Sequence, residues 1–285
     1  MYSRIIAGTM TWGSWGKQLS KKEMIAMMNH CIENGISTFD HADIYGNYEN
    51  ESEFGNAFAE SGIDRETLQL ISKCGIQMTT GRDNKVKHYQ YDKAYIIWSV
   101  EQSLQKLRTD YLDLLLLHRP SPLIQPDEVA QAVQTLLRDG KIKQFGVSNF
   151  TPSQIALIET SVPVTANQVE FSLTHVDCMY DGTFDDCLIE KRMAMAWSPL
   201  GSYFRENDEK KSRLAKILPK LEEKYGATTD QLLLAWLLKH PAKVHPVVGT
   251  TNRERLLKAN KAIALNLELE DWFILLEASQ GYRVP

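Results

Sequence analysis

Short apolar or β-branched stretches alternate along this chain with longer stretches in which apolar residues recur at helical spacing. The short stretches predict eight strands, at residues 4–8, 37–42, 68–74, 112–118, 142–148, 164–170, 193–198 and 244–249. The helical period between them is clearest at residues 21–34, 95–108, 126–138 and 229–239. The pattern therefore predicts eight successive units of one strand and one helical segment.

Strands that alternate with helices form a parallel sheet through right-handed crossovers. The continuous apolar run at 112–118 is typical of a strand that is buried on both faces. Eight units in 285 residues fit the α/β class and, within it, a closed (β/α)8 TIM barrel better than an open doubly wound sheet. No linker rich in proline, glycine or serine divides the chain, so we expect a single domain over residues 1–285. We expect the charged segment 205–211 to be a solvated loop.

Composition narrows the class of protein. The net charge is −4, and without a cluster of lysine and arginine we expect no nucleic-acid partner and no anionic membrane partner. No apolar run approaches the roughly 20 residues of a membrane span, and we expect a cytoplasmic protein. The cysteines lack CxxC spacing, which indicates free thiols instead of disulfides or a zinc site; they are Cys31, Cys74, Cys178 and Cys187.

Four titratable residues lie at or just beyond the carboxyl ends of predicted strands, and the active sites of such barrels lie at that end. Asp40 and Tyr45 belong to the second strand and the loop after it, Lys73 to the third and His118 to the fourth. A lysine ammonium favours the phenolate and so lowers the pKa of a neighbouring tyrosine, while a carboxylate keeps the lysine charged. A histidine can hydrogen-bond an oxygen in the same pocket. The set predicts proton transfer at a carbonyl oxygen.

Each of the four also has an ordinary structural explanation. The aspartate is typical of a helix cap, the tyrosine of packing, the lysine of a snorkelling side chain, and the histidine of a satisfied core residue. Four such residues at successive strand ends favour one shared site. Two further residues of the same segment, His41 and Asp43, are assigned no chemistry; we expect Asp43 at a turn or on the rim and His41 packed beneath the loop.

Seven ordered motifs resemble the aldo-keto reductase superfamily over essentially the whole chain, in details most like the bacterial YdhF-type oxidoreductases; they are FDHADIYG, ISKCG, LDLLLLHRP, GVSNF, NQVEFS, WSPLGS and VVGTTNRERL. The resemblance implies a (β/α)8 barrel that passes a hydride from NADPH to an aldehyde or ketone. It also implies that Tyr45 is the proton donor, that Lys73 lowers its pKa, that Asp40 pairs with Lys73 and that His118 orients the carbonyl.

Other motifs supply the expected cofactor site. Ser148, Asn149 and Gln168 are short polar side chains able to hydrogen-bond a carboxamide, and Trp197 offers a flat surface for a nicotinamide ring. The segment GTTNRERL opens a helix, where backbone N–H groups and Arg255 favour a phosphate. The resemblance implies that the remaining contacts come from Gly8, Thr9, Met10, Ser198, Leu200, Gly201, Gly249, Thr250, Thr251 and Asn260. Two positions depart from the family: some members have lysine in place of Gly249, and the usual asparagine falls one place late, at Asn260.

The sequence thus predicts an NADPH-dependent oxidoreductase acting on a small-molecule carbonyl, with no metal and with a monomer slightly favoured. Two other functions stay open. One is a binding module that senses the cofactor with little turnover. The other is a metal-dependent barrel hydrolase with Asp40, His41, Asp43 and His118 as ligands, which a lysine in the pocket and the absence of paired histidines argue against.

Overall fold

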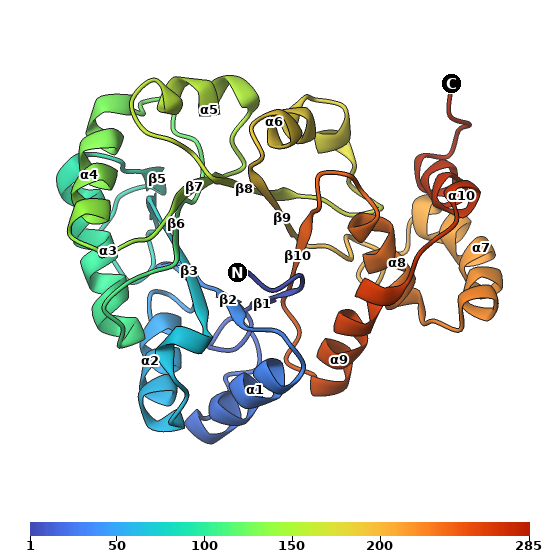
Figure 1. The fold of residues 1–285 in the computed structure, drawn as a ribbon, viewed down its shortest axis with the longest axis horizontal. Coiled ribbons are helices and arrows are strands. Elements are labelled where there is room, and N and C mark those ends of the chain that lie inside the picture. Colours follow the sequence, from blue (N-terminus) through green and yellow to red (C-terminus); the bar gives the residue numbers. More distant parts are fainter.

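The computed structural model describes all residues, 1–285, and contains one closed barrel of eight parallel strands (Figure 1). In barrel order the strands are β1 (Ile6–Gly8), β10 (His245–Val248), β9 (Met193–Trp197), β8 (Ala166–Glu170), β7 (Phe145–Ser148), β6 (Leu114–Leu117), β3 (Gln69–Cys74) and β2 (Thr38–Asp40). Each lies within one predicted range, which confirms the fold class.

Ten α-helices accompany the barrel, and in Figure 1 they lie outside it. They are α1 (Lys21–Glu33), α2 (Asn50–Ser61), α3 (Lys93–Leu107), α4 (Pro126–Arg138), α5 (Pro152–Glu159), α6 (Thr183–Ile189), α7 (Glu209–Tyr225), α8 (Thr229–Leu238), α9 (Arg253–Lys261) and α10 (Leu269–Gln280). Several begin at the signals that the sequence carries: Ser20 and Thr151 each form a capping box with the residue three places on. The four clearest predicted helices are all present.

The barrel interior is packed and not a channel. Seven buried side chains from six strands form a cluster inside it, namely Ile6, Ile71, Leu114, Leu116, Ala166, Met195 and Val247, and the partly buried Tyr2 and Met193 pack against it. Two larger apolar clusters fill the space between strands and helices. The apolar cluster inside the barrel supports the polar residues that follow it along each strand.

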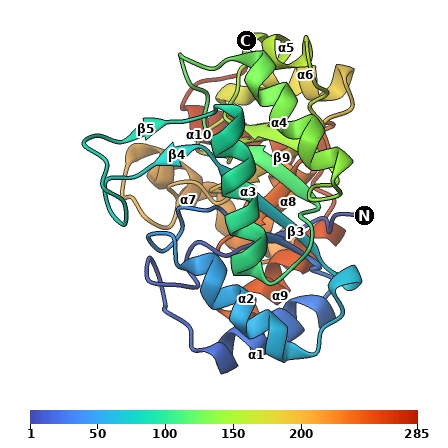
Figure 2. The same cartoon turned by 90° about the vertical axis from the view of Figure 1, so that its left-hand side faces the viewer.

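Two features differ from the sequence prediction. A two-stranded antiparallel sheet, β4 (Ile76–Gln77) and β5 (His88–Tyr89), lies between β3 and α3 and stands at the end of the barrel away from the N-terminus (Figure 2). The segment 205–211 is a loop only in its first half, because α7 begins at Glu209. The helix starts there because the carboxylate of Asp208 accepts a hydrogen bond from the N–H of Lys211, at 2.7 Å.

The cysteine prediction is confirmed, since all four thiols are free and buried. None of the helices combines the length and the apolar character that crossing a bilayer requires.

Candidate active site

Alternation along the strands places the predicted catalytic side chains directly above the apolar cluster inside the barrel. Side chains two residues apart on a strand lie on the same face. Ile71 belongs to that inner cluster, so Lys73 also points into the barrel; Leu116 places His118 in the same way. The same spacing leads from Ala166 to Gln168 and from Met195 to Trp197. One polar layer therefore closes the barrel at the carboxyl ends of its strands.

The structure brings the four predicted catalytic residues together. The ammonium of Lys73 donates to the Asp40 carboxylate at 2.6 Å, to the carbonyl of His41 at 2.9 Å and to the phenolic oxygen of Tyr45 at 3.3 Å. The side chains of Lys73 and Asp40 are 0% and 2% exposed. The Tyr45 ring lies edge-on to His118, with 6.1 Å between ring centroids. A phenol, an ammonium, a carboxylate and an imidazole thus share one small volume.

Burial and charge set the protonation of this group. Burial lowers the pKa of Lys73, but the Asp40 carboxylate and the Tyr45 phenol outweigh burial and hold the pKa above its ordinary value, so the lysine is charged. Burial raises the pKa of Tyr45 against the lowering effect of Lys73, so the phenol carries its proton. Burial and then Lys73 lower the pKa of His118 well below its usual range, which leaves a neutral imidazole. The site holds a protonated phenol beside a fixed positive charge.

A chain of hydrogen bonds connects these residues to four of the predicted cofactor residues. Gln168 Nε2 donates to Asp40 Oδ1 at 2.8 Å, and Ser148 Oγ donates to the Gln168 carbonyl at 2.8 Å. Asn149 Nδ2 donates to Ser148 Oγ at 2.7 Å and accepts at Oδ1 from Trp197 Nε1 at 2.8 Å. Asn149 holds a left-handed φ of 61°, a conformation that asparagine adopts more readily than most other non-glycine residues.

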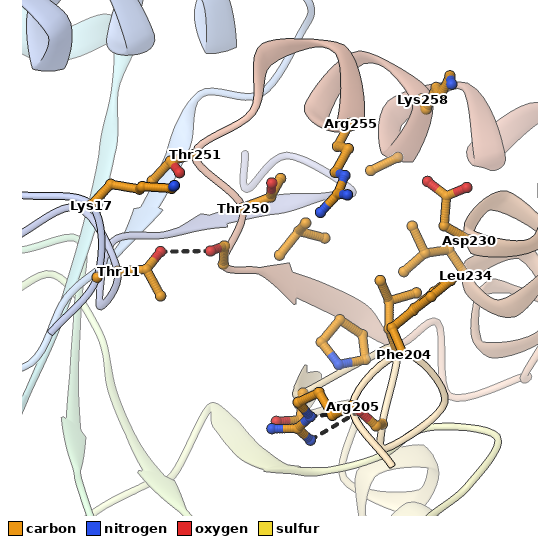
Figure 3. A pocket seen from close by; sticks show the side chains of 18 residues that line it. Thr11, Lys17, Phe204, Arg205, Asp230, Leu234, Thr250, Thr251, Arg255 and Lys258 are labelled. Atoms are coloured by element: carbon orange, nitrogen blue, oxygen red, sulfur yellow. Dashed lines mark hydrogen bonds between the residues drawn. The ribbon is translucent and has the colours of Figure 1, made fainter. Parts of the chain in front are cut away.

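Beside this layer lies a groove of about 950 Å³ between the loops after β9 and β10. Seven predicted cofactor residues line it: Ser198, Leu200, Gly201, Gly249, Thr250, Thr251 and Arg255. Its charged residues are four cations and one carboxylate, namely Lys17, Arg205, Arg255, Lys258 and Asp230. In Figure 3 the Arg255 side chain points from α9 into the groove. The imbalance of charge favours an anionic ligand.

The backbone at Gly249 borders open space, because a Cβ atom built there would meet nothing within 4 Å. Thr11 Oγ1 donates to the Gly249 carbonyl at 2.6 Å and so ties the first loop to the last strand (Figure 3). Asn252 caps α9 by accepting from the N–H of Arg255, at 3.0 Å. A long groove with an exposed backbone and a free arginine fits a phosphate-bearing cofactor such as NADPH.

Four predicted cofactor residues belong neither to the groove lining nor to the chain of hydrogen bonds through Gln168, Ser148, Asn149 and Trp197. Asn260 donates from its amide to the carbonyl of Asn34 at 2.6 Å, and therefore turns toward the end of α1. Thr9 is fully buried and its hydroxyl bonds the Asp40 carbonyl at 3.0 Å and His41 Nδ1 at 2.9 Å. Gly8 is buried and packs on Val247, and Met10 is exposed. The structure gives Asn260 and Thr9 a structural role.

Of the two residues without assigned chemistry, His41 is packed beneath the loop as predicted, and Asp43 lies in a turn as predicted but is buried. Both are buried, at 0% exposure for His41 and 4% for Asp43, so Asp43 is not a rim residue. Burial and Lys73 lower the pKa of His41 to about 3. Burial and the nearby Glu51 raise the pKa of Asp43 to about 7. Asp43 turns toward Tyr95 and Ser99 on α3, and Asp40 pairs with Lys73, so the set proposed as metal ligands does not converge on one point.

Sequence reasoning missed several charged residues at the site. Arg119 follows His118 directly and places its guanidinium 5.4 Å from the centroid of the Trp197 ring. Lys17 and Arg205 lie in loops, and Lys258 lies one turn beyond Arg255 on α9. Arg119 could have been found from its position at a strand end. No local sequence pattern marks the other three, because only the folded structure brings them to the groove.

The sequence of this chain is similar to those of known proteins. The profile of the aldo/keto reductase family matches residues 4–279. "Oxidoreductase YdhF" of Escherichia coli (strain K12) is 39% identical, over 100% of this chain and 96% of that protein. A "6-dehydroglucose reductase" of Agrobacterium fabrum is 37% identical, over 99% of this chain and 96% of that protein.

A solved structure shares the fold over the whole chain. It is an aldo-keto reductase from Klebsiella pneumoniae, described as a complex with NADPH, with a TM-score of 0.79 and 25% identity. The match covers 100% of this chain and 92% of that one.

Proposed function

This chain belongs to the aldo/keto reductase family and is an NAD(P)H-dependent reductase; on that basis we propose that it reduces an aldehyde or ketone to the alcohol, with NADPH as the hydride donor and Tyr45 as the proton donor. The observation that carries the proposal is the 3.3 Å contact between the Tyr45 phenol and the Lys73 ammonium, at the mouth of the barrel. The groove beside it, with its excess of cations, supports the choice of a phosphate-bearing cofactor.

The residues divide into two groups that would hold NADPH. Trp197 offers a flat ring beside the polar groups of Ser148, Asn149 and Gln168, which suit the nicotinamide and its carboxamide. At the far side of the groove, Thr250, Thr251 and Arg255 suit the 2′-phosphate. The solved relative that is described with NADPH supports the same cofactor here.

Side chains of this protein carry out the proton transfer. The Tyr45 phenol would donate its proton to the carbonyl oxygen, and NADPH would supply the hydride for the carbonyl carbon. Lys73 stabilises the phenolate that remains, and Asp40 keeps Lys73 charged and in place. His118 is neutral and offers a hydrogen bond to the same oxygen. The phenolate then recovers a proton from solvent.

Replacing Tyr45 by Phe tests this assignment. We expect turnover of a simple aromatic aldehyde to fall by about 10²–10⁴-fold, because the general acid is lost while the ring remains. The Kd for NADPH, measured by fluorescence titration, should stay within a factor of two or so, because Tyr45 does not line the groove. Undiminished turnover would remove Tyr45 from the role of proton donor.

The same assay separates the reductase from a cofactor-sensing module. Tight NADPH binding by the wild-type protein, without turnover of benzaldehyde or of 6-dehydroglucose, would favour the binding module. The second substrate belongs in the assay because the relative from Agrobacterium fabrum is named for its reduction.

A further inference from the structure

Arg119 is presented at the mouth of the barrel from a fixed backbone. Its N–H donates to the phenolic oxygen of Tyr91 at 3.1 Å, and the Tyr91 hydroxyl donates to the Arg119 carbonyl at 2.5 Å. Tyr91 is itself buried and lies against Gly75, where an added Cβ atom would come within 2.0 Å of the ring. The start of the Arg119 side chain is therefore held directly beside His118, one of the four residues of the catalytic group.

The guanidinium of Arg119 has no acidic partner. It takes part in none of the ion pairs of the protein and packs instead on the Trp197 ring, 5.4 Å from its centroid. Arg192 is the contrasting case, because it is buried between Glu159 and Asp186 at 2.5 Å and 2.9 Å. Arg4, which has no ion pair either, is held by the backbone carbonyls of Leu238, Lys243 and Val244. Arg119 keeps its hydrogen-bond donors free at the place where substrate enters.

Another cation without an ion pair lies just before β5. Lys87, on the segment just before β5, joins Lys73 and Arg119 in acting on the imidazole of His118, after the effect of burial. Lys73 is neutralised by Asp40, whereas Lys87 and Arg119 are not in ion pairs. Arg82 of the same segment is engaged elsewhere: it stacks on Tyr48 and donates to Gln77. Arg119 is thus the unbalanced positive charge that the contacts with Tyr91 and Trp197 place beside the reacting groups.

We propose that Arg119 determines specificity by binding a carboxylate on the carbonyl substrate, so that the preferred substrates are aldehydes or ketones that also carry an acid group. The planar guanidinium can bind a carboxylate through two parallel hydrogen bonds. An arginine that stays solvated at the surface does not need such a partner. This inference rests on the proposed reductase function, and it adds that the preferred substrate carries a negative charge.

Two substrates of nearly the same shape test the proposal: 4-formylbenzoate, which carries a carboxylate, and 4-formylbenzamide, which does not. With saturating NADPH we expect the wild-type protein to have the lower KM for 4-formylbenzoate. In Arg119→Leu the ratio of kcat/KM for the acid to that for the amide should fall by about 10–100-fold, because a charge-assisted hydrogen bond is lost. Arg119→Lys should restore part of the ratio, and Lys87→Met should lower it less than Arg119→Leu. Arg138→Leu removes an exposed arginine from the end of α4 and should leave the ratio unchanged.

A binding measurement keeps the test independent of turnover. Calorimetry of 4-formylbenzoate with the NADP⁺-bound protein should show binding that Arg119→Leu weakens by a similar factor and that added salt also weakens. An equal loss for acid and amide, a wild-type preference for the amide or for a neutral sugar aldehyde, or a weaker Kd for NADPH in Arg119→Leu would each overturn the proposal. Absence of all turnover in the wild-type protein would instead count against the reductase function, while the calorimetry would still decide the role of Arg119.

Discussion

The barrel mouth uses positive charge in two opposite ways. Lys73 is buried and all three of its donors are engaged, by Asp40, by the carbonyl of His41 and by Tyr45. In the groove beside it, Arg255 is exposed, takes part in no ion pair, and points into open space (Figure 3). One cation is satisfied by the protein itself, and the other is left for a ligand.

Physical chemistry explains the difference. A charge removed from water is costly unless a partner and hydrogen bonds replace the lost solvation, so Lys73 can be buried only with Asp40 beside it. An exposed guanidinium remains hydrated at little cost until a phosphate displaces the water. Loss of the buried pair of Lys73 and Asp40 should therefore lower both stability and turnover. Loss of Arg255 should lower only the affinity for the cofactor.

The largest effect is expected from Lys73→Met, which leaves Asp40 as an unpaired buried charge. The free energy of unfolding should fall by about 3–5 kcal/mol, as measured by urea denaturation. Turnover by the folded fraction should fall by about 10²–10⁴-fold, because nothing then stabilises the Tyr45 phenolate.

The matched control is Lys141→Met, which breaks the exposed ion pair with Glu101 at 2.5 Å. Its side chains are 32% and 48% exposed, so the loss of stability should be at most about 1 kcal/mol, with unchanged turnover. If the two substitutions cost the same stability, or if Lys73→Met kept turnover within tenfold of the wild type, the contrast between the two regions would be wrong.

A smaller effect, confined to binding, is expected from Arg255→Ala. The Kd for NADPH should rise by about 10–100-fold through the loss of a charge-assisted phosphate contact, while the Kd for NADH and the midpoint of urea denaturation stay nearly unchanged. Arg253 on the same helix is also exposed and does not line the groove, so Arg253→Ala is the control. Equal weakening of NADPH and NADH by Arg255→Ala would move this arginine away from the 2′-phosphate.

The sequence allows the barrel and the group around Lys73 to be predicted, because both follow from periodicity. A period of two places Lys73 above Ile71 and His118 above Leu116, and parallel strands then align these residues at one rim. The β4–β5 hairpin could not be predicted in this way, since two-residue strands leave no pattern. Arg119 stands at a strand end directly after His118, but its contact with Trp197 could not be predicted, because the two residues are far apart in the chain.

The smallest effect is expected where sequence and structure disagree most clearly, at Asn260. By resemblance it belongs to the cofactor site, but one extra residue, Ala259, takes its place along the groove and the asparagine amide turns to the carbonyl of Asn34. Asn260→Ala should therefore cost about 0.5–1.5 kcal/mol of stability, from one lost hydrogen bond, and leave the Kd for NADPH within a factor of two or so. A tenfold rise in that Kd would mean that Asn260 leaves Asn34 when the cofactor binds. The boundary between the groove and the structural part of α9 would then lie one residue further along the helix.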